Sequence, residues 1–247
     1  MNPIELIQST TYLSGVGIAS ETTPVVSFGD YTTAQIATIG INPSIREFKD
    51  SKGRLLTSTK KRLVDNESLG ALGVTRFNEV QAEQIWNGCK NYFHTRNTYW
   101  TWFKHLEDLL NHSGASYRDN ATHLDLTPWA TDPVWSKLDK SDGSKLLGLN
   151  VSNLNGQVEN SGIKTILFNG RQVYEHLNHH VQWYLKKVDQ LTYTAGGKKQ
   201  TSDLILGDGP KGRPVIGWTI NLQSAKLTKP EREFVVKQLK TFIGKHS

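Results

Sequence analysis

The sequence predicts an α/β protein of three layers, in which helices cover both faces of a central, mostly parallel sheet of four strands. Short apolar runs alternate along the chain with longer segments of helical periodicity, a pattern typical of strands joined by helices. The chain has 247 residues, which is enough for one large α/β domain. We therefore expect a single domain over residues 1–247.

The four predicted strands are short apolar segments, and most of them end in polar residues. They are expected at residues 36–41, 121–126, 164–168 and 214–220. The third strand breaks at Asn169-Gly170 into a predicted helix over residues 171–185.

Two further helices are predicted from apolar periodicity and capping. Residues 98–112 carry aromatic and leucine side chains at helical spacing, which is typical of core packing. A last helix is expected to begin at Thr228, because Thr228 and Glu231 form a capping-box pattern. The apolar face of this helix is expected to comprise Phe234, Val235, Leu239 and Phe242. In contrast, residues 136–162 and 193–203 are rich in small and polar side chains and are predicted to be surface loops.

The composition indicates a globular protein with an excess of basic residues. Hydrophobic residues make up 36% and charged residues 21% of the chain, which argues against general disorder. The formal net charge of +6 permits a polyanionic partner. No apolar run approaches the ~20 residues of a membrane-spanning helix, and the first residues lack the pattern of a secretory signal. We therefore expect a cytoplasmic protein without a membrane partner or an obligate protein partner.

Several common site chemistries find no support in the sequence. Cys89 is the only cysteine, which excludes an internal disulfide and a cysteine-built metal site. His176 and His180 would share one face of a helix, but without an acidic third ligand nearby a solvated helix face is favoured. The sequence contains neither a phosphate-binding loop nor a Gly-x-Ser-x-Gly nucleophile elbow. We expect no metal ion and no cofactor.

Polar residues follow three of the predicted strands. Asn42-Pro43-Ser44 follows the first strand, residues 125–128 end the second, and residues 221–226 follow the fourth. In open α/β sheets ligands bind at the carboxyl ends of the strands. The sequence therefore predicts one site at this edge of the sheet, provided that the three strand ends meet there.

A basic segment comes directly after the first of these strand ends. Residues 46–62 contain seven Lys and Arg but only two acidic residues, Glu47 and Asp50. A solvated face would explain such a segment on its own, whereas its place beside a polar strand end favours contact with phosphates. The residues expected to contact DNA from this segment are Arg46, Lys52, Arg54 and Lys60.

The polar strand ends resemble those of the uracil-DNA glycosylase superfamily, in its branch of mismatch-specific and single-strand-selective enzymes. Gly40-Ile41-Asn42-Pro43-Ser44 is similar to the Gly-x-Asn-Pro-Gly turn of that branch, with Ser44 in place of a glycine. The strand ending at residues 125–128 falls where the family reads the base, and residues 221–226 fall where its minor-groove loop lies. The resemblance extends in order over residues 36–242. It implies the fold of that family and a monofunctional, metal-free DNA glycosylase.

Cleavage of an N-glycosidic bond suits these residue types. The reaction passes through an oxocarbenium-like sugar, so the site must hold a water and stabilise the departing base. Asn42 is the candidate water holder, because its amide oxygen accepts a hydrogen bond without carrying a charge, and Asp125 is the candidate base reader. The structural alternative for Asn42 is the capping of a turn. The other residues expected around the base are Gly40, Ile41, Pro43, Ser44, Phe48, Leu56, Asn169 and Asn221.

A base inside a duplex must be flipped out before it is cleaved, so contacts to the opened DNA are also expected. Leu222 or Gln223 is the candidate wedge between the bases, Ser224 lies in the same loop, and Lys226 is a candidate phosphate ligand. An ordinary connection between a strand and a helix explains this loop equally well.

Two departures from the family pattern predict a cytosine-type base. Asp125 stands where the family usually has an asparagine; an ionised carboxylate only accepts hydrogen bonds, so it suits the amino group of cytosine and repels O4 of uracil. A protonated Asp125 would instead donate toward N3, and a purely structural role would leave the base reader elsewhere. Leu55 and Leu56 stand near the position where the family usually has a stacking aromatic residue, which predicts a pocket open to a bulkier base.

The expected substrate is therefore a 5-modified cytosine, such as hydroxymethylcytosine or its glucosylated form in phage DNA. The resemblance extends to related glycosylases that act in bacterial defence against modified phages. Two alternatives remain open: a conventional uracil glycosylase of base-excision repair, and a catalytically silent nucleic-acid-binding protein with the same fold.

Overall fold

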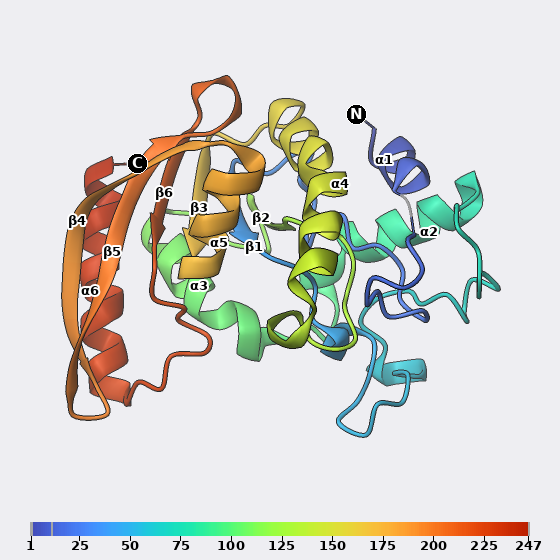
Figure 1. The fold of residues 1–247 in the computed structure, drawn as a ribbon, viewed down its shortest axis with the longest axis horizontal. Helices are drawn as coiled ribbons and strands as arrows, with labels where there is room; N and C mark the ends of the chain where they lie inside the picture. The colour runs from blue at the N-terminus through green and yellow to red at the C-terminus, as the bar shows by residue number, and fades with distance from the viewer. Residues whose placement is uncertain (1, 11, 247) are drawn as a thin grey trace.

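Six strands form one mixed sheet in the order β2-β1-β3-β6-β5-β4 in the computed structural model, which describes residues 2–10 and 12–246. The strands are β1 (Ile36–Gly40), β2 (Ala121–Asp125), β3 (Thr165–Asn169), β4 (Tyr184–Ala195), β5 (Lys198–Asp208) and β6 (Pro214–Trp218). The α-helices are α1 (Pro3–Ser9), α2 (Glu79–Lys90), α3 (Trp100–His112), α4 (Lys140–Glu159), α5 (Arg171–His176) and α6 (Lys229–His246). Helices α4 and α5 cover one face of the sheet, and α3 and α6 cover the other (Figure 1). The α/β class predicted from the sequence is confirmed.

The four strands β2, β1, β3 and β6 run parallel to their neighbours. Gly40 at the end of β1 pairs with Asp125 at the end of β2, and Asn169 at the end of β3 pairs with Trp218 at the end of β6. This register brings the carboxyl ends of all four strands to the same edge of the sheet.

The sheet has six strands rather than the four predicted, because a long hairpin extends it. Strands β4 and β5 pair antiparallel from Tyr184 with Asp208 to Ala195 with Lys198, and β5 pairs antiparallel with β6. The turn is Gly196-Gly197, in which both residues have the positive φ angles, 57° and 75°, that two-residue hairpin turns require. The prediction of a surface loop over residues 193–203 was therefore wrong. Most β4 side chains are exposed, so the strand lacks the alternation of apolar residues that identifies a half-buried strand.

The same hairpin shortens the helix that was predicted over residues 171–185. Helix α5 ends at His176 and continues as one π-helical turn, Leu177–Val181. Gln182 then adopts a left-handed conformation with φ 59°, and β4 begins two residues later.

Helix α4 occupies most of residues 136–162, which were predicted to be a loop. Its buried apolar residues Leu146, Leu147, Leu154 and Val158 recur at helical spacing, and Asp139 caps its first turn by accepting from the backbone N–H of Ser141. The serines of this helix and Gly148 are exposed. Gly143 and Asn150 are buried, and the Gly143 position faces the Trp135 ring.

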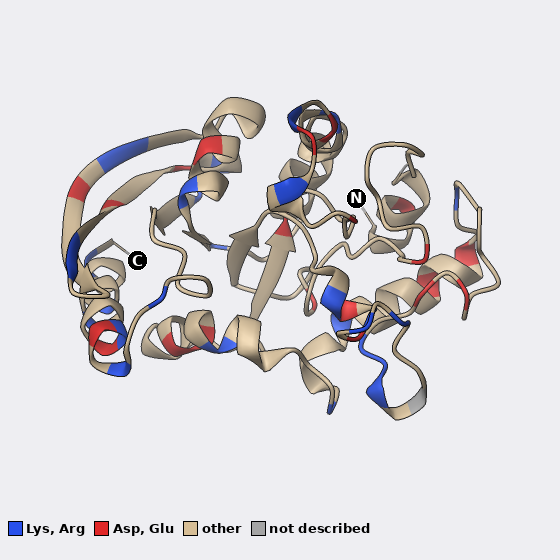
Figure 2. Cartoon of the chain, turned by 60° about the horizontal axis from the view of Figure 1, so that its bottom comes forward, with Lys and Arg blue, Asp and Glu red and all other residues tan. Residues whose placement is uncertain are grey.

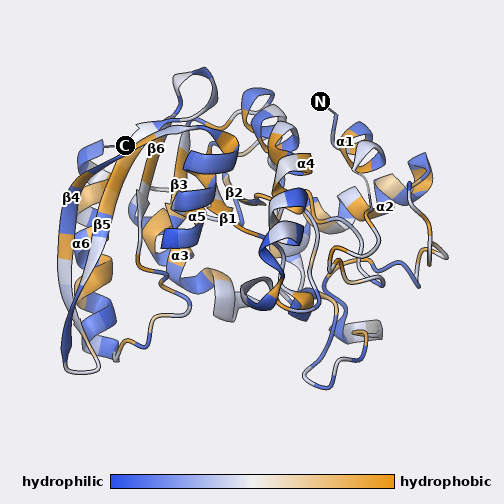
Figure 3. Ribbon diagram, in the orientation of Figure 1, coloured by the Kyte–Doolittle hydropathy of each residue, from blue (hydrophilic) through white to orange (hydrophobic). Residues whose placement is uncertain are grey.

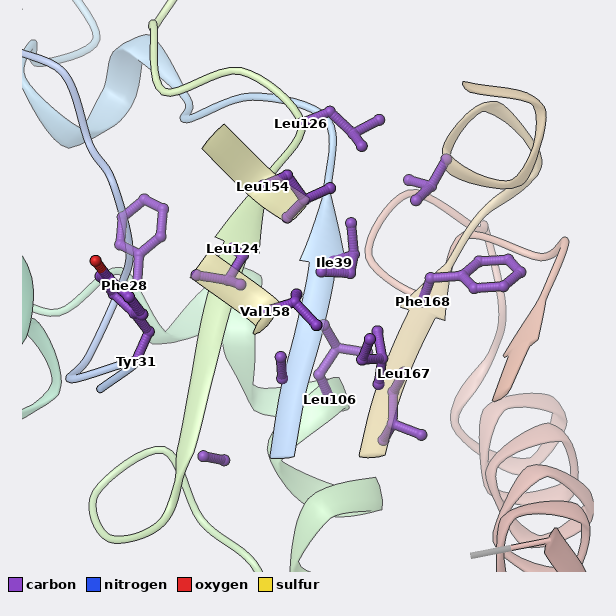
Figure 4. Close-up of a cluster of buried hydrophobic side chains, with 14 of the residues drawn as sticks. Phe28, Tyr31, Ile39, Leu106, Leu124, Leu126, Leu154, Val158, Leu167 and Phe168 are labelled. Atoms are coloured by element: carbon purple, nitrogen blue, oxygen red, sulfur yellow. The ribbon is translucent and has the colours of Figure 1, made fainter. Parts of the chain in front are cut away.

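The core lies on both faces of the parallel strands. Ile39, Leu124 and Leu167 come from β1, β2 and β3, and Leu154 and Val158 of α4 lie close to them (Figure 4). In Figure 3, β5 and β6 carry apolar stretches, whereas β4 is largely hydrophilic and the helices are of mixed polarity along their length. Among the described residues, no helix is long and apolar enough to cross a membrane.

Helix α6 departs in one position from its expected apolar face. Val235, Leu239 and Phe242 are buried as predicted, but Phe234 is 46% exposed and Ile243 is buried instead. The predicted cap is present in part: the Glu231 carboxylate accepts hydrogen bonds from the backbone N–H and the hydroxyl of Thr228, both at 2.8 Å.

Candidate functional site

A cavity of about 390 Å³ opens at the carboxyl edge of the parallel strands. Its walls come from the segments that follow β1, β2, β3 and β6, and from the N-terminal half of α3. The sequence-predicted residues that line it are Gly40, Ile41, Asn42, Pro43, Ser44, Asp125, Asn169, Asn221, Gln223 and Ser224. The three polar strand ends thus meet in one cavity.

The Asn42 side chain is held by its amide nitrogen. Nδ2 donates to the carbonyl oxygen of Pro43 at 3.0 Å, and it lies 3.4 Å from both the carbonyl oxygen of Trp129 and the hydroxyl of Thr131. Three acceptors around one end of the amide fix its orientation, so the oxygen is the end that remains to accept a hydrogen bond in the cavity. Asn42 does not cap the following turn. Ser44 has that role, because its hydroxyl accepts from the backbone N–H of Arg46 at 3.2 Å.

Asp125 lies at the end of β2 beside a second polar side chain of that strand, His123. Both side chains are buried and both line the cavity, with His123 Nε2 lying 3.4 Å from Asp125 Oδ1. Gly40 on the neighbouring strand leaves the room that they occupy. A Cβ at position 40 would lie 2.4 Å from Asp125 Oδ1 and 2.7 Å from His123 Nε2. The glycine of the first motif is therefore required by the two side chains opposite it.

A buried chain of hydrogen bonds orients His123 from behind. The hydroxyl of Thr38 lies 2.6 Å from the Tyr117 hydroxyl and 2.7 Å from His123 Nδ1, but 3.4 Å from the carbonyl oxygen of Thr122. Burial raises the pKa of Tyr117, so this hydroxyl keeps its proton. When Tyr117 donates to Thr38, the Thr38 hydroxyl is free to donate to its nearer acceptor, His123 Nδ1. In the neutral imidazole this arrangement places the ring proton on Nε2, toward Asp125.

Glu47 is a second carboxyl group at the cavity, which the sequence analysis treated only as part of the basic segment. It is 2% exposed, and its Oε2 accepts from the Tyr92 hydroxyl at 2.6 Å. Burial raises the pKa of Glu47 to about 7; the charge of Asp125 raises it further, while Tyr92 and Arg62 oppose the rise. An acidic residue within a basic run directly after the first motif was the available signal. Near neutral pH this carboxyl group therefore titrates in the same cavity as Asp125.

We expect the stability of the protein to depend on pH through Glu47. An acid whose pKa is higher in the folded state binds its proton more tightly there, so the free energy of unfolding falls as the pH rises between the unfolded and folded pKa values. The rise from 4.5 to about 7 corresponds to about 3 kcal/mol. Glu47→Gln, whose neutral amide still accepts from Tyr92, should lack this fall.

Urea unfolding of both proteins at pH 5 and pH 8 measures this difference. The fall in the free energy of unfolding between the two pH values should be larger in the wild type than in Glu47→Gln by about 2–3 kcal/mol. Equal falls in the two proteins would show that Glu47 is ionised throughout this range.

Aromatic side chains line the cavity, although none follows the first motif at the position considered in the sequence. Phe28 and Phe103 lie with ring centroids 5.2 Å apart, and each ring is within 6 Å of His123. Trp102 and Trp135 line the same cavity. Phe28 precedes β1, and Phe103 lies on α3, far along the chain from the first motif. A search limited to the residues directly after that motif could therefore not find them.

Phe48 and Leu56 are not part of the cavity wall. They are 2% and 8% exposed, and the backbone N–H of Leu56 donates to the carbonyl oxygen of Phe48 at 2.8 Å. Both side chains belong to the core beneath the segment that follows β1. The prediction that they contact a base is therefore not supported by their positions.

The side chains of Asn169 and Asn221 form hydrogen bonds with the loop that follows β6. Asn169 Oδ1 accepts from Trp218 Nε1 and from the backbone N–H of Leu222, and its Nδ2 donates to Gln223 Oε1. Asn221 Oδ1 accepts from the backbone N–H groups of Gln223 and Ser224, at 3.0 and 3.1 Å. Both ends of the Asn169 amide therefore take part in bracing the loop, while the residue also lines the cavity.

Of the two candidate wedge residues, only one is accessible. Leu222 is 0% exposed and packs in the core, which removes it as a wedge. Gln223 lines the cavity, and Ser224 and Lys226 are exposed in the same loop.

Several cations of the basic segment over residues 46–62 are paired or hydrogen-bonded within the protein. Arg54 forms an ion pair with Asp50 at 2.8 Å, and Arg46 donates to the backbone carbonyl of Asp50. Lys52 and Lys60 are exposed, but neither lines the cavity. Two further cations pair with acidic residues outside the segment: Lys49 with Glu21 at 3.0 Å and Lys61 with Asp65 at 2.6 Å. The segment is therefore less positive than its sequence suggests.

The histidines of α5 and the π-helical turn do not form a metal centre. The His176 and His180 rings lie 5.5 Å apart. Within residues 2–10 and 12–246, no group of three or more His, Cys, Asp or Glu side chains is placed to hold a metal ion.

No protein-family model matches the sequence, and a search of curated proteins gives no match.

Proposed function

We propose that the protein is a monofunctional DNA N-glycosylase that excises a 5-modified cytosine. The observation that carries the proposal is the Asn42 amide, which is fixed by its nitrogen at the carboxyl edge of the sheet, in one cavity with Asp125 and His123. This set supplies an oriented acceptor for a water molecule and a carboxylate for a base. The likeness of the first motif to the uracil-DNA glycosylase superfamily points to the same reaction.

The proposed reaction needs only these side chains and water. Water attacks C1′ of the deoxyribose, the bond between C1′ and the base nitrogen breaks, and the base leaves with the electron pair; the proton that the water loses ends on the departed base. Asn42 Oδ1 accepts a hydrogen bond from the attacking water and orients it beneath the sugar. The ionised Asp125 accepts from the exocyclic amino group of the cytosine. Glu47, with its pKa of about 7, holds a proton in the same cavity at lower pH.

The size of the cavity favours a base with a substituent. A volume of about 390 Å³ falls within the range of sites that bury a drug-sized ligand, about 300–1,000 Å³, and exceeds the space of a bare pyrimidine. Trp102 and Trp135 offer flat apolar faces for a base or for a hexose attached to it. Hydroxymethylcytosine and glucosyl-hydroxymethylcytosine are therefore the proposed substrates, and DNA is the proposed partner.

One observation favours a conventional uracil glycosylase as a second candidate. His123 Nε2 lies 3.4 Å from Asp125 Oδ1 in the cavity wall, and it carries the ring proton of the neutral imidazole when Thr38 donates to Nδ1. A donor from His123 to O4 and an acceptor on Asp125 for N3–H would together suit uracil.

A parallel substrate panel tests the proposal. Duplexes that contain a single uracil, hydroxymethylcytosine or glucosyl-hydroxymethylcytosine are incubated with the protein and then cleaved with hot alkali, which breaks the strand at abasic sites. We expect strand breaks at one or both modified cytosines. Breaks at uracil alone would favour the second candidate, and binding without breaks in any duplex would favour a catalytically silent DNA-binding protein.

A further inference from the structure

A second large hollow lies between α3 and α6, outside the cavity described above. Its volume is about 580 Å³, and we call it the α3–α6 groove. Five of its lining residues are cations: Lys104, Lys229, Arg232, Lys237 and Lys240. Two are acidic, Asp108 and Glu233, so the groove has an excess of positive charge. In Figure 2 several basic positions lie on the helices near the C-terminus.

The charge of this groove is mostly not neutralised within the chain. Among the described residues, the only ion pair of its cations joins Lys229 to Glu233, at the long distance of 4.0 Å. Arg232 donates to the carbonyl oxygens of Leu222 and Ala225, at 2.6 and 3.3 Å, and these neutral acceptors leave its charge in place. The basic segment over residues 46–62 differs in this respect, because several of its cations pair with carboxylates.

His105 lies inside the groove and responds to this positive charge. Its pKa is lowered first by partial burial and then by Arg232 and Lys104, while Asp108 acts in the opposite direction. The electrostatic potential that the neighbouring side chains create at His105 is therefore positive. An anion bound in the groove would lower this potential and raise the pKa of His105.

The groove and the cavity share two structural elements, α3 and the loop after β6. Helix α3 presents Trp102, Phe103 and Leu106 to the cavity, whereas Lys104 and His105 line the groove. On the other side, Arg232 holds the loop whose members Gln223 and Ser224 line the cavity. Because both hollows are built on these two elements, the groove is the basic surface that we assign to DNA flanking a nucleotide in the cavity.

We propose that the α3–α6 groove binds the phosphodiester backbone of the DNA that flanks the extruded nucleotide. This inference rests on the proposed function for the identity of the polyanion. Lys229 and Lys240 lie about 16 Å apart along α6 at the ~1.5 Å rise of a helix, so the groove follows several phosphates of one strand. Contacts between lysine side chains and phosphates contribute affinity for DNA that does not depend on its sequence.

The test compares two variants that each remove three positive charges. Lys104→Gln/Lys237→Gln/Lys240→Gln removes cations of the groove. Lys164→Gln/Lys186→Gln/Lys211→Gln removes two cations that precede β3 and β6 and one on the exposed strand β4, none of which lines the cavity or the groove. Fluorescence anisotropy measures the affinity of each protein for an unmodified duplex between 50 and 300 mM salt, and thermal unfolding verifies that both variants are folded.

We expect the groove variant to lose more than tenfold in affinity at low salt. The slope of log K against log salt should become shallower by about 2–3, because each lost phosphate contact removes ~0.9. The control variant should keep the wild-type slope. A groove variant with the slope of the wild type would overturn the proposal, and the groove would then suit an acidic protein surface instead.

Two further readouts keep this inference separate from the proposed function. Addition of the duplex should raise the pKa of His105, followed by its imidazole NMR signal and assigned with His105→Asn; an unchanged pKa would contradict the proposal. Base release from the substrate panel is measured on the same preparations. A wild-type protein that binds DNA with the expected slope but releases no base would overturn the proposed function and leave the groove assignment standing.

Discussion

Replacement of Asn42 by alanine is expected to lower the rate of base release by roughly 10²–10⁴-fold, the range for the loss of one positioned catalytic group. The amide oxygen is the only part of this side chain that remains to orient a water, because Nδ2 already faces three acceptors. The turn itself should survive, since Ser44 and not Asn42 caps it. Single-turnover formation of abasic sites measures the effect, and anisotropy should show DNA affinity within a few-fold of the wild type.

Asn111→Ala provides the matched control for this variant. Asn111 is exposed on α3 and does not line the cavity, so its loss should leave the rate unchanged. If Asn42→Ala released the base as fast as the wild type, the reaction would not depend on the residue that the first motif singles out.

Gly40→Ala should disrupt the site by steric means alone. The added methyl group would lie 2.4 Å from Asp125 Oδ1 and 2.7 Å from His123 Nε2, both of which are shorter than any normal contact. The two side chains must therefore move, and a displacement of about 1 Å in a reacting site costs on the order of 100-fold in rate. Overpacking at this half-buried position should also lower the free energy of unfolding by about 1–3 kcal/mol.

A second glycine offers the control for Gly40→Ala. Gly148 lies within α4, and a Cβ there meets nothing within 4 Å. Gly148→Ala should leave base release unchanged and raise the free energy of unfolding by up to about 1 kcal/mol, because alanine favours the helix. A wild-type rate in Gly40→Ala would show that the placement of Asp125 and His123 is irrelevant to the reaction.

The sequence predicted that the site lies at the carboxyl edge of the sheet, because parallel strands all end at the same edge. Once the apolar runs at residues 36–41 and 121–126 were assigned to parallel strands, the polar residues after them had to lie near one another. Ten of the proposed site residues line the cavity for this reason. The hydrogen bonds of these residues could not be predicted from the strand pattern. Asn169, for example, accepts from Trp218 Nε1 and from the backbone N–H of Leu222, and no sequence pattern pairs it with either residue.

The two elements that the sequence did not predict, β4 and α4, have compositions that hide their secondary structure. Strand β4 is almost entirely exposed, and α4 carries three glycines among its buried leucines. The walls of the cavity were missed for a different reason: Phe28 and Phe103 are distant from the motif in sequence and reach it only through the packing of α3 on the sheet. Glu47 was overlooked because its burial, not its position in the chain, distinguishes it from a surface acid.

The most direct test of the account is to identify the molecule that the protein releases. A duplex with a single glucosyl-hydroxymethylcytosine, and matched duplexes with hydroxymethylcytosine and uracil, are incubated with wild type and with Asn42→Ala. Mass spectrometry then measures the free base, and alkaline cleavage measures the abasic sites. The account predicts equal amounts of free modified cytosine and abasic sites with the wild type, and almost none with the variant. Release of uracil alone would contradict the assigned substrate, and the absence of any free base would contradict N-glycosylase activity itself.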